Sequence, residues 1–556
     1  MEPRHRSSRP DSGWQWAAGG DVNAFFGLML DNLGDMILMA SLLVAVFELP
    51  RTFVLRNMIP GTAVGVLLGD LVFTAMAFRL ARRSGRPDVT AMPLGLDTPS
   101  TFGAVYLIIG PAYQDALKRG LDAGHAARHA WFLGIAMLLA SGVFKIGCSF
   151  VSGWVRRVVP RAGLLGSLTA IALVIISFLP GLDIMAHPVA GLTALALVLA
   201  TLTARWHLPR RIPGALGAVA VGCLVYYGMH LCGLGPGLGA EGDAPALAWR
   251  GALPFPMVEW WAWFGESWRE AVGYLPVAIP LALATVIGGI DCTESAAAAG
   301  DDYPTGVVIA VEGAATLAAG MFGGVIQSTP YIGHPAYKAM GARAGYTLAT
   351  ALFVGAAGVL GYFDWFFYLI PKAVIFPILI FIGLEITAQS FHATPHRHYP
   401  AVALACVPAL AYLALLAINQ VLPEVGKPFG DLRPSTQHWI LTVTMLSGGF
   451  IVTSLLWAAT LSHLIDGRMR PAAATLMVAA VFAWFGVIHS PLPSSPIDSP
   501  GRVIRELKAS GRWPAAAEQT PYHWAAGYLA AATALLALAR WGTPPAASEP
   551  ELPKAV

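Results

Sequence analysis

Long apolar runs separated by short polar joints fill most of this chain, from Phe25 to Ala539. Most runs reach about 20 residues, the length that an α-helix needs to cross the hydrocarbon core of a bilayer. The pattern predicts an all-α polytopic membrane protein. The fourteen predicted spans lie near residues 24–47, 60–80, 98–113, 131–155, 162–180, 187–204, 213–234, 271–299, 305–322, 329–342, 346–362, 371–389, 401–419 and 439–463.

Two further apolar runs, near 471–489 and 525–539, follow these spans. The segment between them is rich in Pro and Ser, which predicts irregular structure with one short amphipathic helix. Two extra helices would return the C-terminus to the inner side of the membrane. They would pack on neighbouring helices or at a dimer contact, and both alternatives stand.

The third and tenth predicted spans are unusually short, and each begins with a polar segment that contains proline. "LDTPSTFGAVY" and "QSTPYIGHPAY" both contain Thr-Pro, followed by a tyrosine seven residues after the proline. Each segment begins the third span of a seven-span half, and two halves with an odd number of spans have opposite orientations. A broken helix at matching points of an inverted repeat indicates a transporter binding site. The alternative is a proline kink in two ordinary helices.

Composition supports a membrane protein, because 56% of the 556 residues are apolar and only 12% are charged. The basic tail, residues 1–23, lacks the apolar core of a signal peptide. Lys and Arg concentrate in the joints that lie inside when the N-terminus is cytoplasmic. We therefore expect a multi-pass protein of the plasma membrane (the bacterial inner membrane) with both termini in the cytoplasm. The five cysteines are scattered and predict neither a metal site nor a disulfide framework.

Acidic residues within the predicted spans are the first functional candidates, because each costs at least ~2.5 kcal/mol on insertion. The first span contains a group of three polar residues, and the eighth contains another. Several carboxylates in one poorly hydrated site cannot all stay ionised, so these groups suit proton or sodium coupling. The two groups are Asp31, Asn32 and Asp35, and Asp291, Thr293 and Glu294.

Four other charged or titratable residues fall in or near the spans. Asp97 precedes the break of the third span, and His334 follows that of the tenth. His334 either hydrogen-bonds a ligand or is a satisfied interior histidine. Glu312 is either functional or a brace for its neighbours, and Lys145 either snorkels or pairs with a carboxylate.

These segments resemble the nucleobase/cation symporter-2 family, which includes the uracil, xanthine and adenine/guanine permeases. The resemblance covers roughly residues 24–464 and rests on "VIGGIDCTESA", "GGVIQSTPYIGHPAYKAMG" and "LDTPSTFG". It implies two inverted seven-span repeats, a core domain and a gate domain, a homodimer, and short strands before the half-helices of spans 3 and 10.

The resemblance also implies the division of the chain. The expected parts are a cytoplasmic tail (1–23), core (24–161), gate (162–235), an outer joint (236–270), core (271–362), gate (363–464) and a C-terminal extension with two helices (465–556).

In that family an acid of span 8 holds the base, and Asp291 looks like that acid. The sequence departs from the family at Gly333, where an acid is usual, and in span 1, where Gln-His is common. The expected substrate-binding residues are Asp291, Glu294, Thr293, Asp97, Thr98, Ser100, Phe102, Gln327, Ser328, Thr329, Tyr331 and His334. The expected coupling residues are Asp31, Asn32, Asp35, Asp291 and Glu294, with H+ or Na+ as the coupling ion and no metal or cofactor.

The resulting expectation is a secondary transporter that imports a nucleobase or similar small heterocycle by alternating access. Its partners would be the substrate, membrane lipid and a second copy, with no nucleic acid. The alternative is a sulfate- or bicarbonate-type anion transporter of the same fold: half-helix N-termini favour an anion, whereas the many acids disfavour one. The sequence lacks common catalytic and nucleotide-binding motifs, so an enzyme is not expected.

Overall fold

The computed structural model describes residues 14–158, 161–209, 212–234, 254–331, 333–392, 394–424, 429–492, 500–509 and 520–542. In this part of the chain nine helices are long and apolar enough to cross a membrane, or up to eleven if two bent pairs each count as one span. Three shorter apolar helices accompany them, and the two strands form one small sheet. The predicted fold class is therefore confirmed, and the chain is a multi-pass membrane protein.

The chain divides into two compact units. The first unit comprises residues 1–156 and 175–385, and the second comprises 157–174 and 386–556. The functional division into core and gate, the plasma membrane and the orientation of the termini stay predictions.

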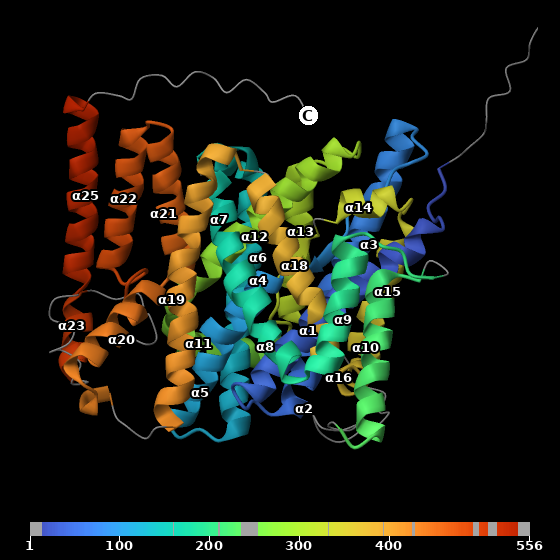
Figure 1. Cartoon of the computed structure of the whole chain (residues 1–556), viewed down its shortest axis with the longest axis horizontal. Coiled ribbons are helices and arrows are strands. Elements are labelled where there is room, and N and C mark those ends of the chain that lie inside the picture. The colour runs from blue at the N-terminus through green and yellow to red at the C-terminus, as the bar shows by residue number, and fades with distance from the viewer. Residues whose placement is uncertain are drawn as a thin grey trace, which may run out of the picture. The chain divides into compact units, whose positions relative to one another are not determined.

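Helices of many lengths build the first unit (Figure 1). Short π-helical turns, labelled η, interrupt several of them. Its helices are α1 (Gly20–Ala45), α2 (Arg51–Phe53), η1 (Val54–Met58), α3 (Ile59–Ser84), α4 (Thr98–Gly103), η2 (Ala104–Ile109), α5 (Gly110–Lys118), α6 (Ala123–Val158, ending just beyond the unit), α8 (Phe178–Ala186), α9 (Pro188–Val198), η4 (Leu199–Thr203) and α10 (Gly214–Leu231). They continue with α11 (Met257–Gly273), α12 (Leu275–Ala298), α13 (Thr305–Met321), α14 (His334–Ala339), α15 (Gly345–Leu360), α16 (Phe363–Leu369) and α17 (Lys372–Ile375). η3 (Ala172–Ser177) and α18 (Pro377–His392) run across the boundary between the units.

The joint predicted at 236–270 contains an amphipathic helix, α11, in its described part. Its polar side holds it to the first unit, because Glu270 pairs with Arg119 at 3.2 Å and with His129 at 3.1 Å. The Trp260 indole donates to the Phe132 carbonyl at 3.0 Å. Residues 236–253 of this joint and residues 1–13 of the predicted tail lie outside the described residues.

Strands β1 (Leu94–Leu96) and β2 (Ser328–Pro330) pair antiparallel, with Gly95 opposite Thr329. Two helix side chains accept hydrogen bonds from β1: Asp70 accepts the Leu94 N–H at 3.0 Å, and Asn32 accepts the Leu96 N–H at 3.1 Å. A two-stranded sheet leaves outer backbone groups unpaired, and in a membrane these must find protein partners. The polar residues of spans 1 and 2 thus keep irregular backbone stable at membrane depth.

Each strand precedes a helix that begins abruptly, as expected for the two halves of an inverted repeat. Pro99 stands in the first turn of α4, and Pro335 stands in the first turn of α14. The two Thr-Pro pairs are therefore not equivalent, because Thr329-Pro330 lies within β2. The expected register of the two copies is wrong, since proline is tolerated both in a first helical turn and in an edge strand.

The helices of the first unit approach closely at glycines. A Cβ on Gly313 of α13 would lie 3.0 Å from the Gly142 carbonyl oxygen of α6, and one on Gly142 would lie 3.1 Å from the Gly313 carbonyl oxygen. Small residues allow such close backbone contact between membrane helices. This crossing brings together the residues that follow Gly142 and precede Gly313.

The second unit contains two 3₁₀ turns, η6 (His396–His398) and η7 (Phe429–Asp431). Its helices are α7 (Arg161–Ile171), α19 (Tyr399–Glu424), α20 (Pro434–Ser447), α21 (Phe450–Ile465), α22 (Met469–Trp484), α23 (Pro500–Ala509) and α25 (Pro521–Trp541). The span expected at 439–463 is not one straight helix, because α20 and α21 meet at 73°. Gly449 at this bend has φ +66°, and a Cβ there would lie 2.2 Å from the Val487 carbonyl oxygen. Glycine permits both the left-handed backbone and the close approach.

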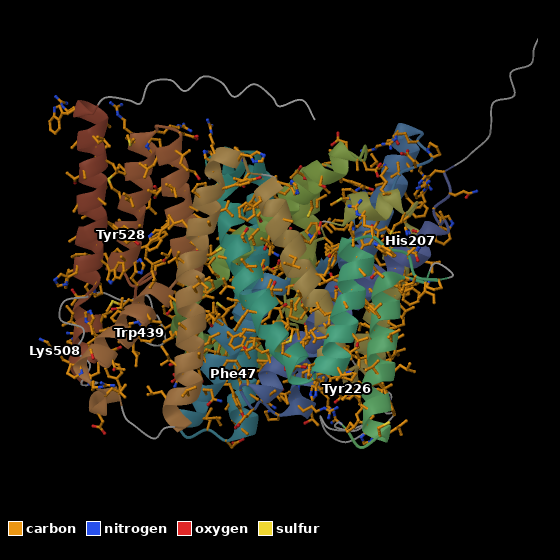
Figure 2. All side chains as sticks on the ribbon, viewed as in Figure 1. Phe47, His207, Tyr226, Trp439, Lys508 and Tyr528 are labelled. Carbon is orange, nitrogen blue, oxygen red and sulfur yellow. The ribbon has the colours of Figure 1, made fainter. Side chains whose placement is uncertain are left out.

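The two extra apolar runs form α22 and α25, and α25 docks through a polar aromatic cluster. Tyr528 lies on α25 (Figure 2). It accepts a hydrogen bond from Trp457 at 2.8 Å and contacts His489 at 2.6 Å. The His489 ring stacks on Trp524 at 3.9 Å. These residues attach the C-terminal helices to the rest of the second unit.

Candidate functional site

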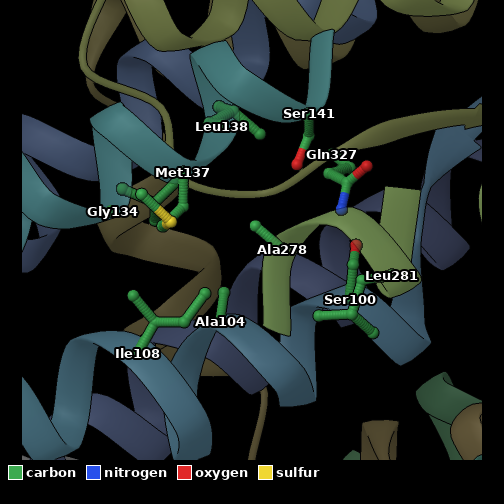
Figure 3. A pocket seen from close by; sticks show the side chains of 11 residues that line it. Ser100, Ala104, Ile108, Gly134, Met137, Leu138, Ser141, Ala278, Leu281 and Gln327 are labelled. Atoms are coloured by element: carbon green, nitrogen blue, oxygen red, sulfur yellow. The ribbon is translucent and has the colours of Figure 1, made fainter. Parts of the chain in front are cut away.

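A small cavity in the first unit lies beside the β1–β2 sheet, at the start of α4. Its volume is about 20 Å³. Its lining is mostly apolar, but Ser100, Ser141 and Gln327 turn polar atoms into it and toward one another (Figure 3). The remaining lining residues are Ala104, Ile108, Gly134, Met137, Leu138, Ala278, Leu281 and Val325. A mainly apolar cavity with a few convergent polar groups is the usual form of a small-molecule site.

Ser100 is held by the cap of helix α4. The Asp97 carboxylate accepts the Ser100 backbone N–H at 2.8 Å, and the Ser100 hydroxyl donates to the Asp97 carbonyl at 3.0 Å. Such a cap satisfies an N–H that the helix itself leaves unpaired. Asp97 therefore stabilises the start of the half-helix, and its negative charge offsets the positive end of the helix dipole.

The segment before β2 supplies the opposite wall. The Gln327 carbonyl accepts the Asp97 N–H at 2.9 Å, which ties this segment to the start of α4. Among the described residues, neither Gln327 Oε1 nor Ser328 Oγ has a hydrogen-bond partner, although both are buried. Thr329 pairs within the sheet. Buried polar atoms without partners are uncommon, and of these two only Gln327 belongs to a residue that lines the cavity, so its amide is available to a ligand.

A buried ion pair lies against β2. Lys145 Nζ is 2.8 Å from Glu312 Oε1, and both side chains are fully buried. Lys145 also donates to the Ser328 carbonyl at 2.9 Å. Lys145 follows Ser141 by one turn of α6, so a positive charge stands next to the cavity. The glycine crossing of α6 and α13 makes this pairing possible.

The span 1 residues surround β1. Asn32 accepts the Leu96 N–H, and Asp35 accepts the Thr98 hydroxyl at 3.0 Å. Asp31 lies over the sheet, because a Cβ on Gly95 would be 3.5 Å from Asp31 Oδ2. The Oδ1 atoms of Asp31 and Asp35 are buried without a hydrogen-bond partner in the described chain. These acids contact the strand and the half-helix and do not line the cavity.

The span 8 candidates face other neighbours. The Thr293 hydroxyl bonds to the Ile290 carbonyl at 2.8 Å and to Thr305 at 2.9 Å, where α13 begins. Asp291 is partly exposed and does not line the cavity. The side chain of Glu294 lies outside the described residues. The structure therefore does not bring Asp291 or Thr293 into the cavity.

The predicted aromatic contacts also lie elsewhere. Phe102 is buried and parallel to Tyr106, with ring centroids 6.2 Å apart, and Tyr331 pairs with Tyr337 at 6.0 Å. Neither Phe102 nor Tyr331 lines the cavity.

His334 belongs to a separate cluster around the buried carboxylate of Asp301. Its Nε2 lies 3.2 Å from the Thr90 carbonyl and 3.3 Å from Asp301 Oδ2. Lys338 and Arg86 reach the other Asp301 oxygen at 2.7 and 3.3 Å. Burial raises the pKa of Asp301, but its contacts with His334, Lys338 and Thr90 outweigh this and hold the pKa below its ordinary value. His334 thus holds α14 in place and lies outside the cavity.

The sequence analysis did not select Ser141 as a site residue, and it did not predict that Lys145 and Glu312 pair with each other. A hydroxyl and a lysine one turn apart in an apolar span are a signal for one polar helix face. In the described chain no group of three or more His, Cys, Asp or Glu side chains has the arrangement of a metal site.

No protein-family model and no curated protein matches this chain. Among solved structures, the transmembrane domain of a cyanobacterial bicarbonate transporter, BicA, is 15% identical with a TM-score of 0.45, over 69% of this chain and 92% of that one. The structure of SLC26A9 is 12% identical with a TM-score of 0.49, over 80% of this chain and 65% of that one. The murine SLC26A9 anion transporter in its inward-facing state is 15% identical with a TM-score of 0.47, over 70% and 64%.

These comparisons correct one expectation from the sequence. The assignment to the nucleobase/cation symporter-2 family is wrong, because no family model supports it and the similar solved structures are those of anion transporters.

Proposed function

We propose that this chain is a secondary transporter that carries a small anion across the membrane by alternating access. The observation that carries the proposal is the position of Lys145, which places a buried positive charge at the Ser328 carbonyl beside the Ser100, Ser141 and Gln327 cavity. A small anion is also the class of substrate named for the bicarbonate transporter and the anion transporter among the similar solved structures.

The polar groups of the cavity suit an oxyanion or a halide. Gln327 has two N–H donors, and the hydroxyls of Ser100 and Ser141 can rotate to donate to a ligand. Hydrogen bonds to a charged acceptor are about twice as strong as neutral ones. Asp97 opposes an anion less than an isolated carboxylate would, because its charge is committed to the helix N-terminus.

The same cavity suits a planar heterocycle poorly. Among the described residues, its lining offers no aromatic side chain on which a ring could stack. Phe102 and Tyr331 are each paired with an aromatic residue of their own half. The acid expected to hold a base, Asp291, is not in the lining.

Several features of the proposal go beyond the site itself. We place the transporter in the bacterial inner membrane as a homodimer, with both termini in the cytoplasm and with transport coupled to H+ or Na+.

Uptake into proteoliposomes tests the proposal, with labelled bicarbonate, sulfate, chloride and formate as probes and labelled uracil as the uncharged comparison. We expect saturable uptake of at least one anion and none of uracil. Ser141→Ala should lower that uptake about tenfold or more, the effect of losing one hydrogen bond to a charged ligand.

Ser149→Ala is the matched control, because Ser149 is on the same helix and donates to the Ile146 carbonyl at 2.6 Å, away from the cavity. Uracil uptake that no anion inhibits would overturn the proposal, and so would equal anion uptake by both serine variants.

A further inference from the structure

We infer that Glu312 couples anion transport to protons, because Glu312 and the anion compete for Lys145. The inference rests on the proposed function. It assigns a proton-binding role to a residue of α13 that does not line the cavity.

The geometry leaves Glu312 dependent on Lys145. The 2.8 Å ion pair is fully buried, and Lys145 is the cation that Glu312 faces among the described residues. The other groups around Glu312 are the Asp97 carboxylate at the start of α4, the Thr285 hydroxyl and Cys292 thiol of α12, and the Cys148 thiol of α6. On the side of α12, a Cβ on Gly289 would lie 2.9 Å from Glu312 Oε2, so the carboxylate is closely enclosed.

The hydrogen bonds of the neighbouring acids Asp97 and Asp35 come from groups other than Lys145. Asp97 accepts the Ser100 N–H at 2.8 Å, and Asp35 accepts the Thr98 hydroxyl at 3.0 Å. Asp31 lies over the Gly95 side of the sheet. Glu312 is therefore the carboxylate that loses the most electrostatic stabilisation when Lys145 contacts another anion.

Charge balance then sets the stoichiometry. Before binding, the Lys145 ammonium and the Glu312 carboxylate neutralise each other. A bound anion would leave two negative charges sharing one positive charge in a low-dielectric site, which is strongly unfavourable. If Glu312 takes up one proton from solution to become a neutral acid, Lys145 neutralises the anion instead. A monovalent anion thus enters with one proton, and no net charge crosses the membrane.

Glu312→Gln tests this coupling, because glutamine keeps the shape of the side chain and cannot exchange a proton. The probes are labelled chloride and labelled sulfate, whose charge does not change between pH 5.5 and 8. Bicarbonate is excluded because a pH gradient alters its own concentration. The wild type should accumulate its anion when the outside is acidic. Accumulation by the variant should be at least tenfold lower than by the wild type. Its rate of exchange of internal for external anion should stay within about threefold of the wild-type rate.

Glu266→Gln is the matched control, since Glu266 is an exposed carboxylate on α11. It should accumulate anion as the wild type does. A Glu312→Gln variant that accumulates anion normally would overturn the inference and leave the proposed function standing. Failure of the wild type to carry chloride or sulfate, by contrast, counts against the proposed function for these probes.

A second variant decides the matter if Glu312→Gln does not insert into membranes. The double variant Lys145→Gln with Glu312→Gln removes both charges of the buried pair, which is better tolerated than removing one. Sulfate raises the melting temperature of the wild type more at pH 5.5 than at pH 8 if the inference is right. The same pH dependence in the double variant would overturn it, and its loss would support it.

Discussion

The two strand-and-helix motifs of the first unit have the same backbone plan but different chemistry. The first motif, β1 with α4, has an acidic cap at Asp97, and its helix continues through η2 and α5 to Lys118. The second motif, β2 with α14, begins at Gly333 without a side-chain cap and ends after six residues. The first motif turns Ser100 into the cavity, whereas the helix of the second turns His334 and Lys338 toward Asp301.

This difference shows that the two motifs of an inverted repeat can have different roles, one at the cavity and one in structural support. A long capped half-helix satisfies more of its own backbone groups and can present a side chain to a ligand. A helix of six residues cannot hold its position through its own hydrogen bonds, so it depends on tertiary contacts. Asp301, from the joint between α12 and α13, supplies those contacts for α14.

The largest effect is expected from removing the anchor of the second motif. Asp301→Ala should lower the free energy of unfolding by about 3–5 kcal/mol, because Lys338, Arg86 and His334 would lose their buried common partner. The melting temperature of the purified protein in detergent measures the effect. A loss below about 1 kcal/mol would show that α14 does not depend on this cluster.

Giving the second motif the cap of the first should destabilise it. Gly333→Asp should lower the free energy of unfolding by about 1–3 kcal/mol, because a Cβ at Gly333 would lie 2.5 Å from the Tyr331 ring. Gly333→Asp combined with Tyr331→Ala should recover part of the loss in the same melting assay. An increase in stability from the single change would mean that the two helix starts are interchangeable.

Removing the cap of the first motif should have a smaller effect on stability. Asp97→Ala should cost about 1 kcal/mol, the usual contribution of an acidic N-cap. Asp97→Asn should cost less, because asparagine also accepts the Ser100 N–H. Hydrogen exchange at residues 98–103 would localise the change, and faster exchange in α14 alone would contradict it.

The smallest effect concerns the exposed part of the second motif's anchor. The hydrogen bond from Arg86 lowers the pKa of Asp88, whose side chain is 47% exposed. A lowered pKa means that the contribution is present above the unfolded value of 3.8 and fades as the pH falls below it. Asp88→Asn should therefore cost less than about 1 kcal/mol at pH 7, and its difference from the wild type should shrink below pH 4. Asp301, whose pKa is also lowered, should lose its larger contribution over the same acidic range. Acid melting curves of both variants would separate the two carboxylates.

Most of the fold was predictable from the sequence because hydropathy and proline act locally. Apolar length located the spans, and Pro99 marked the start of α4 to the residue, since proline fits the first turn of a helix. The same rule misplaced the start of the second half-helix, because Pro330 lies in an edge strand and the proline in the first turn of α14 is Pro335. The bend at Gly448 and Gly449 was missed because the apolar pattern continues through it.

The candidate site was predictable only in part. Ser100, Gln327 and the acids around β1 were selected because polar groups are costly in a span. The position of His334 could not be predicted, because it depends on the Asp301 carboxylate between α12 and α13. The partner of Lys145 could not be predicted either, because it depends on where α6 crosses α13.

The sequence by itself determined that the chain crosses the membrane many times, that two of its spans are broken, and which spans carry charge, because a membrane penalises each polar group in a span separately. Only the tertiary structure decided that Lys145 pairs with Glu312, that His334 serves Asp301, and that Ser100, Ser141 and Gln327 share one cavity. These pairings depend on the glycine crossing at Gly142 and Gly313 and on the register of β1 with β2, which no local pattern encodes.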